Sequence, residues 1–123
     1  MQRPTHKELS NKLRQAKAFV KAGQVILLDQ VVLAADALEL DYSIELELLE
    51  VLNELFEKTT PDNYSGSRPP KRSYEVEISG LDLFAFVVKI DRFEVPVYYK
   101  FTISKDALWL VSLHEDNTNK EVP

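Results

Sequence analysis

The stretch from residue 95 to residue 114, VPVYYKFTISKDALWLVSLH, decides the fold of this chain. Apolar and aromatic side chains occupy every second position of its first part, at Val97, Tyr99, Phe101 and Ile103. A period of two is typical of a strand with one face buried. A tight connection at 104–106 leads into a second apolar run. Strands joined by so short a connection run antiparallel, so the sequence predicts a hairpin of 95–103 and 107–114.

Two further strands are expected before this hairpin. Residues 73–79 alternate Tyr74, Val76 and Ile78 with polar side chains, which indicates a half-buried strand. Residues 83–90 are apolar on both faces, which favours a central strand. The connections at 80–82 and 91–94 are short. The pattern therefore predicts an antiparallel meander of about four strands.

The front half of the chain has helical spacing instead. Helices are expected at 7–22, 31–38 and 43–56, with a short extended piece at 26–28. Thr5 and Glu8 are spaced as a capping box for the first helix, and Ser43 is placed to cap the third. The resulting fold class is α+β, with N-terminal helices packed on a C-terminal antiparallel sheet.

The 123 residues fit a single domain spanning 1–123, with a mobile basic loop at 59–72 and a polar tail at 115–123. The chain has no cysteine, which excludes disulfides, thiol nucleophiles and cysteine-bound metals. Neither a signal-peptide core nor an apolar run long enough to span a membrane is present, so a cytoplasmic protein is expected. No metal and no cofactor are expected.

The net charge of −5 is unevenly distributed along the chain. Residues 1–57 carry −4, residues 58–105 carry +2, and residues 106–123 carry −3. An acidic protein is a poor general binder of nucleic acid, but the basic middle segment keeps a local RNA site open. The alternative is ordinary solvated charge.

Three side chains in the sheet could perform chemistry. Tyr98 and Lys100 alternate away from the core, where an aromatic ring and an ammonium group can stack a base and hold a phosphate. His114, at the end of the last strand, could move a proton near neutral pH. An ordinary polar outer face and a solvent-exposed histidine are the alternatives. Lys58 ends the third helix, where it also complements the helix dipole.

Five short motifs follow one another along the chain. They are AGQV at 22–25, LELD at 38–41, FEKTT at 56–60, VYYKFTI at 97–103 and LWLVSLH at 108–114. In this order and spacing the chain resembles the MqsR-type toxins of bacterial type II toxin–antitoxin systems over residues 3–115. These toxins are small ribonucleases of RelE-like fold.

The resemblance implies a metal-independent endoribonuclease that cleaves mRNA and is neutralised by an antitoxin protein. It implies catalytic roles for Lys58 and Tyr98, and for His114, which stands where the family has a lysine. RNA binding is expected at four cations, Lys100, Arg68, Lys71 and Arg72. Ala85 stands where the family has an active-site glutamine.

A second hypothesis is a non-catalytic protein-interaction domain on the same scaffold. The two hypotheses differ in the placement of Lys58, Tyr98, Lys100 and His114. Clustering of these side chains in one groove favours the ribonuclease. Scattering of the four, together with an exposed apolar sheet edge, favours the interaction domain.

Overall fold

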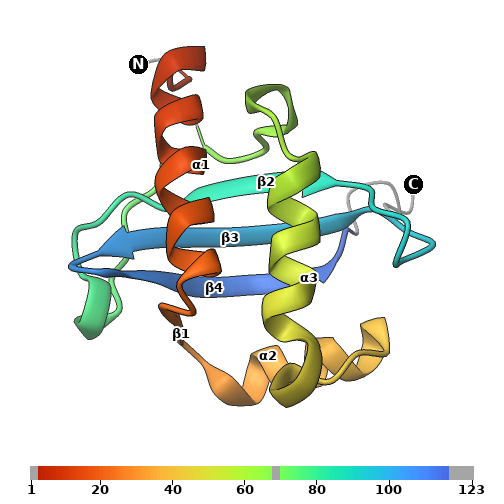
Figure 1. The fold of residues 1–123 in the computed structure, drawn as a ribbon. Coiled ribbons are helices and arrows are strands. Elements are labelled where there is room, and N and C mark those ends of the chain that lie inside the picture. The colour runs from red at the N-terminus through yellow and green to blue at the C-terminus, as the bar shows by residue number, and fades with distance from the viewer. Residues whose placement is uncertain (1–2, 68–69, 117–123) are drawn as a thin grey trace, which may run out of the picture.

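The structure, a computed structural model, describes residues 3–67 and 70–116. This part of the chain forms three α-helices, two short 3₁₀ helices and a four-stranded sheet. Figure 1 shows their arrangement. The bounds of the α-helices and strands are α1 (His6–Lys21), β1 (Val25–Leu27), α2 (Gln30–Leu40), α3 (Ile44–Lys58), β2 (Phe84–Val88), β3 (Val97–Ser104) and β4 (Ala107–Glu115). The predicted α+β class, with helices first and sheet last, is confirmed.

The helices begin where polar caps stand in the sequence. Thr5 Oγ1 accepts from the Glu8 amide at 3.1 Å, and the Glu8 carboxylate accepts from the Thr5 amide at 2.8 Å, which completes the predicted capping box. Ser43 accepts from the Leu46 amide at the start of α3. Gly23 follows α1 with φ +74°, a conformation that favours glycine and ends the helix.

The sheet has the strand order β1-β4-β3-β2. Strands β2, β3 and β4 form an antiparallel meander, whereas β1 pairs with β4 in parallel. Helices α1 and α3 lie across one face of the sheet, and α2 contacts β4 (Figure 1). The core lies between these two layers.

Aromatic side chains fill the centre of the core. The Phe56 ring of α3 meets the rings of Tyr99 and Phe101 edge-on, at 5.3 and 5.4 Å between centroids. The Tyr99 hydroxyl is buried and lies 2.7 Å from Thr59 Oγ1, which itself donates to the Leu55 carbonyl. Since the hydroxyl hydrogen of Thr59 is used in that bond, Tyr99 is the donor of the other. One buried chain of hydrogen bonds thus joins the end of α3 to the middle of β3.

A β-bulge interrupts the pairing of β3 with β4. Lys100 is opposite Ser112, but Phe101 is opposite Leu110, so Val111 is the extra residue. Before the bulge the even-numbered residues of β4 face the core, and after it the odd-numbered Leu113 does. The bulge therefore turns His114 away from the helices.

The prediction of a strand at 73–79 is wrong. This segment holds a short 3₁₀ helix, Val76–Ile78, and the side chains of Tyr74 and Val76 are 96% and 89% exposed. The Ser73 backbone is instead bonded to Leu81 and Gly80 within the loop. The fourth strand is β1, which was expected only as a short extended piece. This strand follows α1 directly in the chain and pairs in parallel with the outer edge of β4.

The prediction that 83–90 is a central strand is also wrong, since β2 is an edge strand. Its apolar character has another cause. Tyr64 forms a bridge opposite Phe86, and the Ser65 amide donates to the Ala85 carbonyl at 2.8 Å, so the loop after α3 covers this edge. The helices cover one face of β2 and the loop backbone covers its outer edge. The strand is therefore buried although only one strand, β3, pairs with it.

The predicted tail begins later than residue 115. Glu115 belongs to β4, and the Asp116 amide donates to the Pro96 carbonyl at 2.9 Å. The remainder of the expected tail, 117–123, lies outside the described residues.

Arg92 ties the connection between β2 and β3 to helix α3. Its guanidinium lies 3.0, 2.9 and 2.7 Å from the carboxylates of Glu47, Glu50 and Glu54. The hydrogen bond from Arg92 is the main reason that the pKa of Glu54 lies below its usual value of 4.5. The three acids lie along one side of α3, so a single guanidinium reaches all of them and offsets part of their negative charge.

We predict that Arg92→Gln lowers the free energy of unfolding at neutral pH by about 1–2 kcal/mol, since the three carboxylates are then left without their cation. Arg92 lowers the pKa of Glu54 only in the folded state. The ionised Glu54 therefore stabilises the fold at a pH above 4.5, the usual pKa of a glutamate, and this stabilisation is lost as the pH falls through the lowered pKa. The deficit of the variant should therefore shrink in acid.

Denaturant unfolding at about pH 7 and about pH 3 measures this deficit. Arg14→Gln, which removes an exposed arginine of α1, is the matched control and should change stability by less than about 0.5 kcal/mol. A deficit of the same size at both pH values would contradict the prediction.

Candidate functional site

The candidate site lies on the face of the sheet opposite α1 and α3. Tyr98 and Lys100 of β3 point to this face because Tyr99 and Phe101 point to the core. Their cross-strand neighbours are Val87 and Ala85 in β2 and His114 and Ser112 in β4. No helix within 3–67 or 70–116 covers this face (Figure 1).

Tyr98 and His114 form a stacked pair. Their ring centroids are 5.1 Å apart and the rings are inclined by only 18°. His114 Nδ1 lies 2.8 Å from the Glu115 carbonyl. Because a carbonyl oxygen only accepts, Nδ1 carries the hydrogen, and Nε2 of the neutral ring is left to accept a proton. Burial raises the pKa of Tyr98, so its hydroxyl stays protonated at neutral pH.

A small pocket of about 200 Å³ adjoins this pair. It is lined by Ser65, Gly66, Ser67, Lys71, Leu83, Ala85, Tyr98 and Lys100. Burial lowers the pKa of Lys100, and the positive charge of Lys71 lowers it further. Two ammonium groups that repel each other in a confined space are stabilised by an anion between them. The pocket therefore has the electrostatics of an anion site.

The loop after α3 is held in place by contacts from distant parts of the chain. Arg3 donates to the Pro61 carbonyl at 2.6 Å and lies over the Tyr64 ring. Tyr64 packs edge-on against Phe86 and donates to the Ser67 carbonyl. A side chain at Gly66 would come within 2.9 Å of the Tyr64 ring, so glycine allows the ring to fold back on its own loop.

The segment that carries Lys71 is also bonded to the sheet. The Leu83 amide donates to the Lys71 carbonyl at 2.8 Å, and buried Thr102 donates to the Asp82 carbonyl at 2.7 Å. Lys71 is thereby placed beside Lys100, although 29 positions separate them in the sequence.

The structure brings together four of the residues expected in the site, which we term the sheet-face site: Lys71, Tyr98, Lys100 and His114. Lys58 is not among them. It ends α3 on the helix side of the sheet, in a separate pocket with Glu54, Glu57, Ile90, Asp91 and Arg92. Arg72 is exposed and lies 3.4 Å from Asp82. Arg68 falls outside the described residues.

Two features of the site have no sequence signal. Ser65 and Ser67 reach the pocket only because the loop is tied to β2. Trp109 is opposite Thr102 and shares the open face with His114, although the two differ in phase along β4. A bulge reverses the phase, and periodicity alone does not reveal it. Ala85, which by resemblance stands where MqsR-type toxins have an active-site glutamine, lines the pocket opposite Lys100.

Across 3–67 and 70–116, no group of three or more His, Cys, Asp or Glu side chains is arranged to hold a metal ion. No helix in those ranges has the length and apolar character needed to cross a membrane. Comparisons with known protein families and with curated proteins find no match to this chain. Its function must therefore be argued from the site.

We predict that Lys71→Gln raises the pKa of Lys100, because one of its two causes of depression is removed. The pKa should remain below the usual 10.5, since burial persists in the variant. Titration of the lysine side-chain carbons by NMR measures the change. Lys7→Gln, at an exposed position of α1, is the control and should leave the Lys100 titration unchanged. An unchanged Lys100 in the Lys71 variant would contradict the proximity of the two cations.

Proposed function

We propose that this protein is a cytoplasmic, metal-independent endoribonuclease that cleaves mRNA at the sheet-face site and is neutralised by an antitoxin protein. The observation that carries the proposal is the stacked Tyr98–His114 pair beside the pocket of Lys71 and Lys100. It joins a proton acceptor, a protonated hydroxyl and two cations on one open surface. Those are the groups that cleavage of RNA through its own 2′-hydroxyl requires.

In the proposed reaction, His114 Nε2 takes the proton of a ribose 2′-hydroxyl. The oxygen attacks the adjacent phosphorus, and the bond from phosphorus to the 5′-oxygen breaks. Tyr98 gives its proton to that leaving oxygen. The products are a 2′,3′-cyclic phosphate and a 5′-hydroxyl end. Because burial raises the pKa of Tyr98, the phenolate is short-lived and regains a proton from the imidazolium stacked on it.

The cations and the rings have separate tasks. Lys71 and Lys100 stabilise the negative charge that develops on the phosphorane, and an anion between them relieves their mutual repulsion. The exposed edges of the Tyr98–His114 stack, with Trp109 on the same face, provide surfaces on which bases can stack. Lys58 has no role in this mechanism because it lies on the helix side of the sheet.

The first test uses the two histidines of the chain. His114→Ala should lower the rate of RNA cleavage about 100-fold or more, the usual effect of losing a general base. His6→Ala, an exposed residue of α1 purified in parallel, should cleave at the wild-type rate and reports any contaminating nuclease. Cleavage of a short labelled RNA in EDTA, with identification of the ends, is the measurement.

A wild type that cleaves RNA, with cleavage by His114→Ala at the same rate, would refute the site. A wild type that binds RNA or a protein partner without cleaving RNA would instead support the interaction domain. These two results are distinct, so the assay tests the site and the function separately.

The second test removes the proposed acid and keeps its ring. Tyr98→Phe should preserve the stack on His114 and lower the cleavage rate about 10- to 100-fold, because only the proton donor is lost. Tyr74→Phe is the matched control, since the Tyr74 side chain is exposed in the loop. Circular dichroism checks that both variants fold. Wild-type cleavage by Tyr98→Phe would assign the leaving-group proton to another residue.

A further inference from the structure

Helix α2 carries apolar residues on its exposed side as well as on its buried side. Eight of its 11 residues are apolar, but only Leu33, Ala37 and Leu40 are buried. Val31 and Leu38 are each 80% exposed, and Ala34 between them is also exposed. A helix that is apolar on all sides is normally enclosed by protein. The outer face of α2 thus lacks a cover among the described residues.

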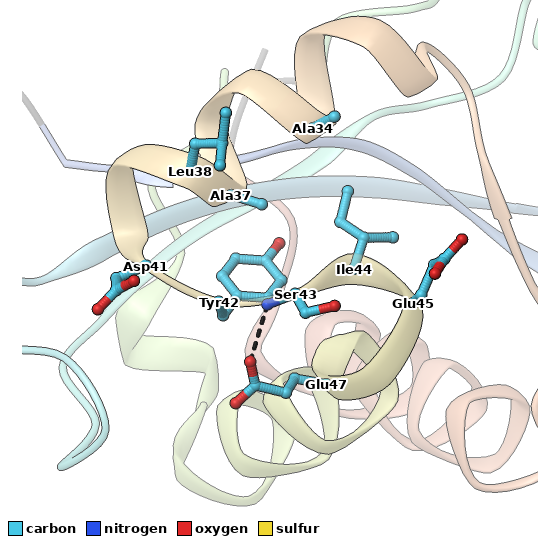
Figure 2. Close-up of a pocket in the computed structure, with 9 residues that line it drawn as sticks. All are labelled: Ala34, Ala37, Leu38, Asp41, Tyr42, Ser43, Ile44, Glu45 and Glu47. Atoms are coloured by element: carbon cyan, nitrogen blue, oxygen red, sulfur yellow. Dashed lines mark hydrogen bonds between the residues drawn. The ribbon is translucent and has the colours of Figure 1, made fainter.

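A groove runs beside this face, between α2 and the beginning of α3 (Figure 2). It has a volume of about 610 Å³ and is lined by Ala34, Ala37, Leu38, Asp41, Tyr42, Ser43, Ile44, Glu45 and Glu47. Tyr42 is buried in its wall, and its hydroxyl has no hydrogen-bond partner in the part of the chain that the structure describes. The groove combines apolar walls with an acidic margin.

The charge of this region has one sign. Residues 22–57 contain nine Asp and Glu and no Lys or Arg. Arg92 pairs with Glu47, Glu50 and Glu54 on the side of α3. Three other acids lie at the groove and form no salt bridge within the described residues: Asp41 and Glu45 line it, and Asp36 acts electrostatically on Tyr42 in its wall.

We propose that the α2–α3 groove binds a basic amphipathic helix of a partner protein. The apolar face of that helix would cover Val31, Ala34 and Leu38, and its Lys and Arg side chains would meet the acidic margin. The three apolar residues span about 10 Å along α2, which corresponds to roughly two turns of a partner helix. Electrostatic attraction would speed and orient the encounter.

Other occupants fit less well. The basic helix of this chain is α1, but its apolar residues Leu9, Ala16 and Val20 are buried in its own core. A second copy would present its own α2, whose surroundings are as acidic as those of the first, so two copies would bring like charges together. An anionic membrane surface would be repelled by the acidic margin. Charge and apolarity together therefore favour a separate basic helix.

The probe is a synthetic peptide of about 15 residues, with leucine on one helical face and lysine on the others, which is long enough to cover the groove. Its affinity is measured by fluorescence anisotropy at two salt concentrations, with a peptide of the same composition in scrambled order as control. The protein variants are Val31→Gln/Leu38→Gln for the apolar face and Asp41→Asn/Glu45→Gln for the margin. Val76→Gln, which changes an equally exposed valine elsewhere, is the matched control.

The wild type should bind the amphipathic peptide about tenfold or more tightly than the scrambled one. Val31→Gln/Leu38→Gln should lose about tenfold or more in affinity, and Asp41→Asn/Glu45→Gln should lose severalfold together with part of the salt dependence. Val76→Gln should bind as wild type. Circular dichroism verifies folding, and no RNA is present, so the result is independent of the proposed ribonuclease activity.

Three outcomes would overturn the proposal. Equal binding of both peptides would reduce the effect to unspecific charge attraction. Unaltered binding by Val31→Gln/Leu38→Gln would place the peptide elsewhere. Sedimentation of the protein alone that shows a dimer, dissociated by the same double variant, would identify a second copy of this chain as the occupant.

Discussion

The extra residue in β4 is the constraint on which both faces of the sheet depend. A strand of strict alternation would direct His114 to the same side as Leu108 and Leu110, into the aromatic core. The bulge at Val111 resets the alternation, so that Leu113 is buried and His114 stacks on Tyr98. One inserted position thus completes the core on one face and assembles the candidate site on the other.

The second requirement is a covered edge. Strand β2 has no neighbouring strand on its outer side, and the loop after α3 provides Tyr64 and Ser65 as backbone partners instead. These contacts bring Ser67 to the open face, and the bond from the Leu83 amide to the Lys71 carbonyl places Lys71 there beside Lys100. The device that protects an edge strand from pairing with other chains therefore also builds the pocket. In this fold, stability and the candidate site share one set of hydrogen bonds.

The two candidate surfaces are separate and opposite in charge. The sheet-face site gathers Lys71 and Lys100 on the side of the sheet without helices, whereas the α2–α3 groove has carboxylates at its margin. Each surface attracts what the other repels. A negative net charge thus coexists with a local anion site, because the acids concentrate in residues 22–57 and the cations of the pocket come from a later loop and strand.

The sequence by itself determined the elements whose signal is local. The caps at Thr5 and Ser43 and the alternation of β3 depend on residues a few positions apart, and all were predicted. The hairpin was predicted as well, but the stacking of His114 on Tyr98 depends on the bulge, which no local pattern shows. Alternation at 73–79 was misleading because a strand also needs a partner edge, and the edge of β2 was already occupied.

Only the tertiary structure decided which distant residues meet. It placed Lys71 beside Lys100 and left Lys58 behind the sheet, and it made β1 the fourth strand. Such contacts depend on the paths of the loops and on which faces pack together. A local pattern of side chains does not specify either of these. The sequence therefore specified the helices, the hairpin and its polar face, whereas packing selected the residues that this face presents together.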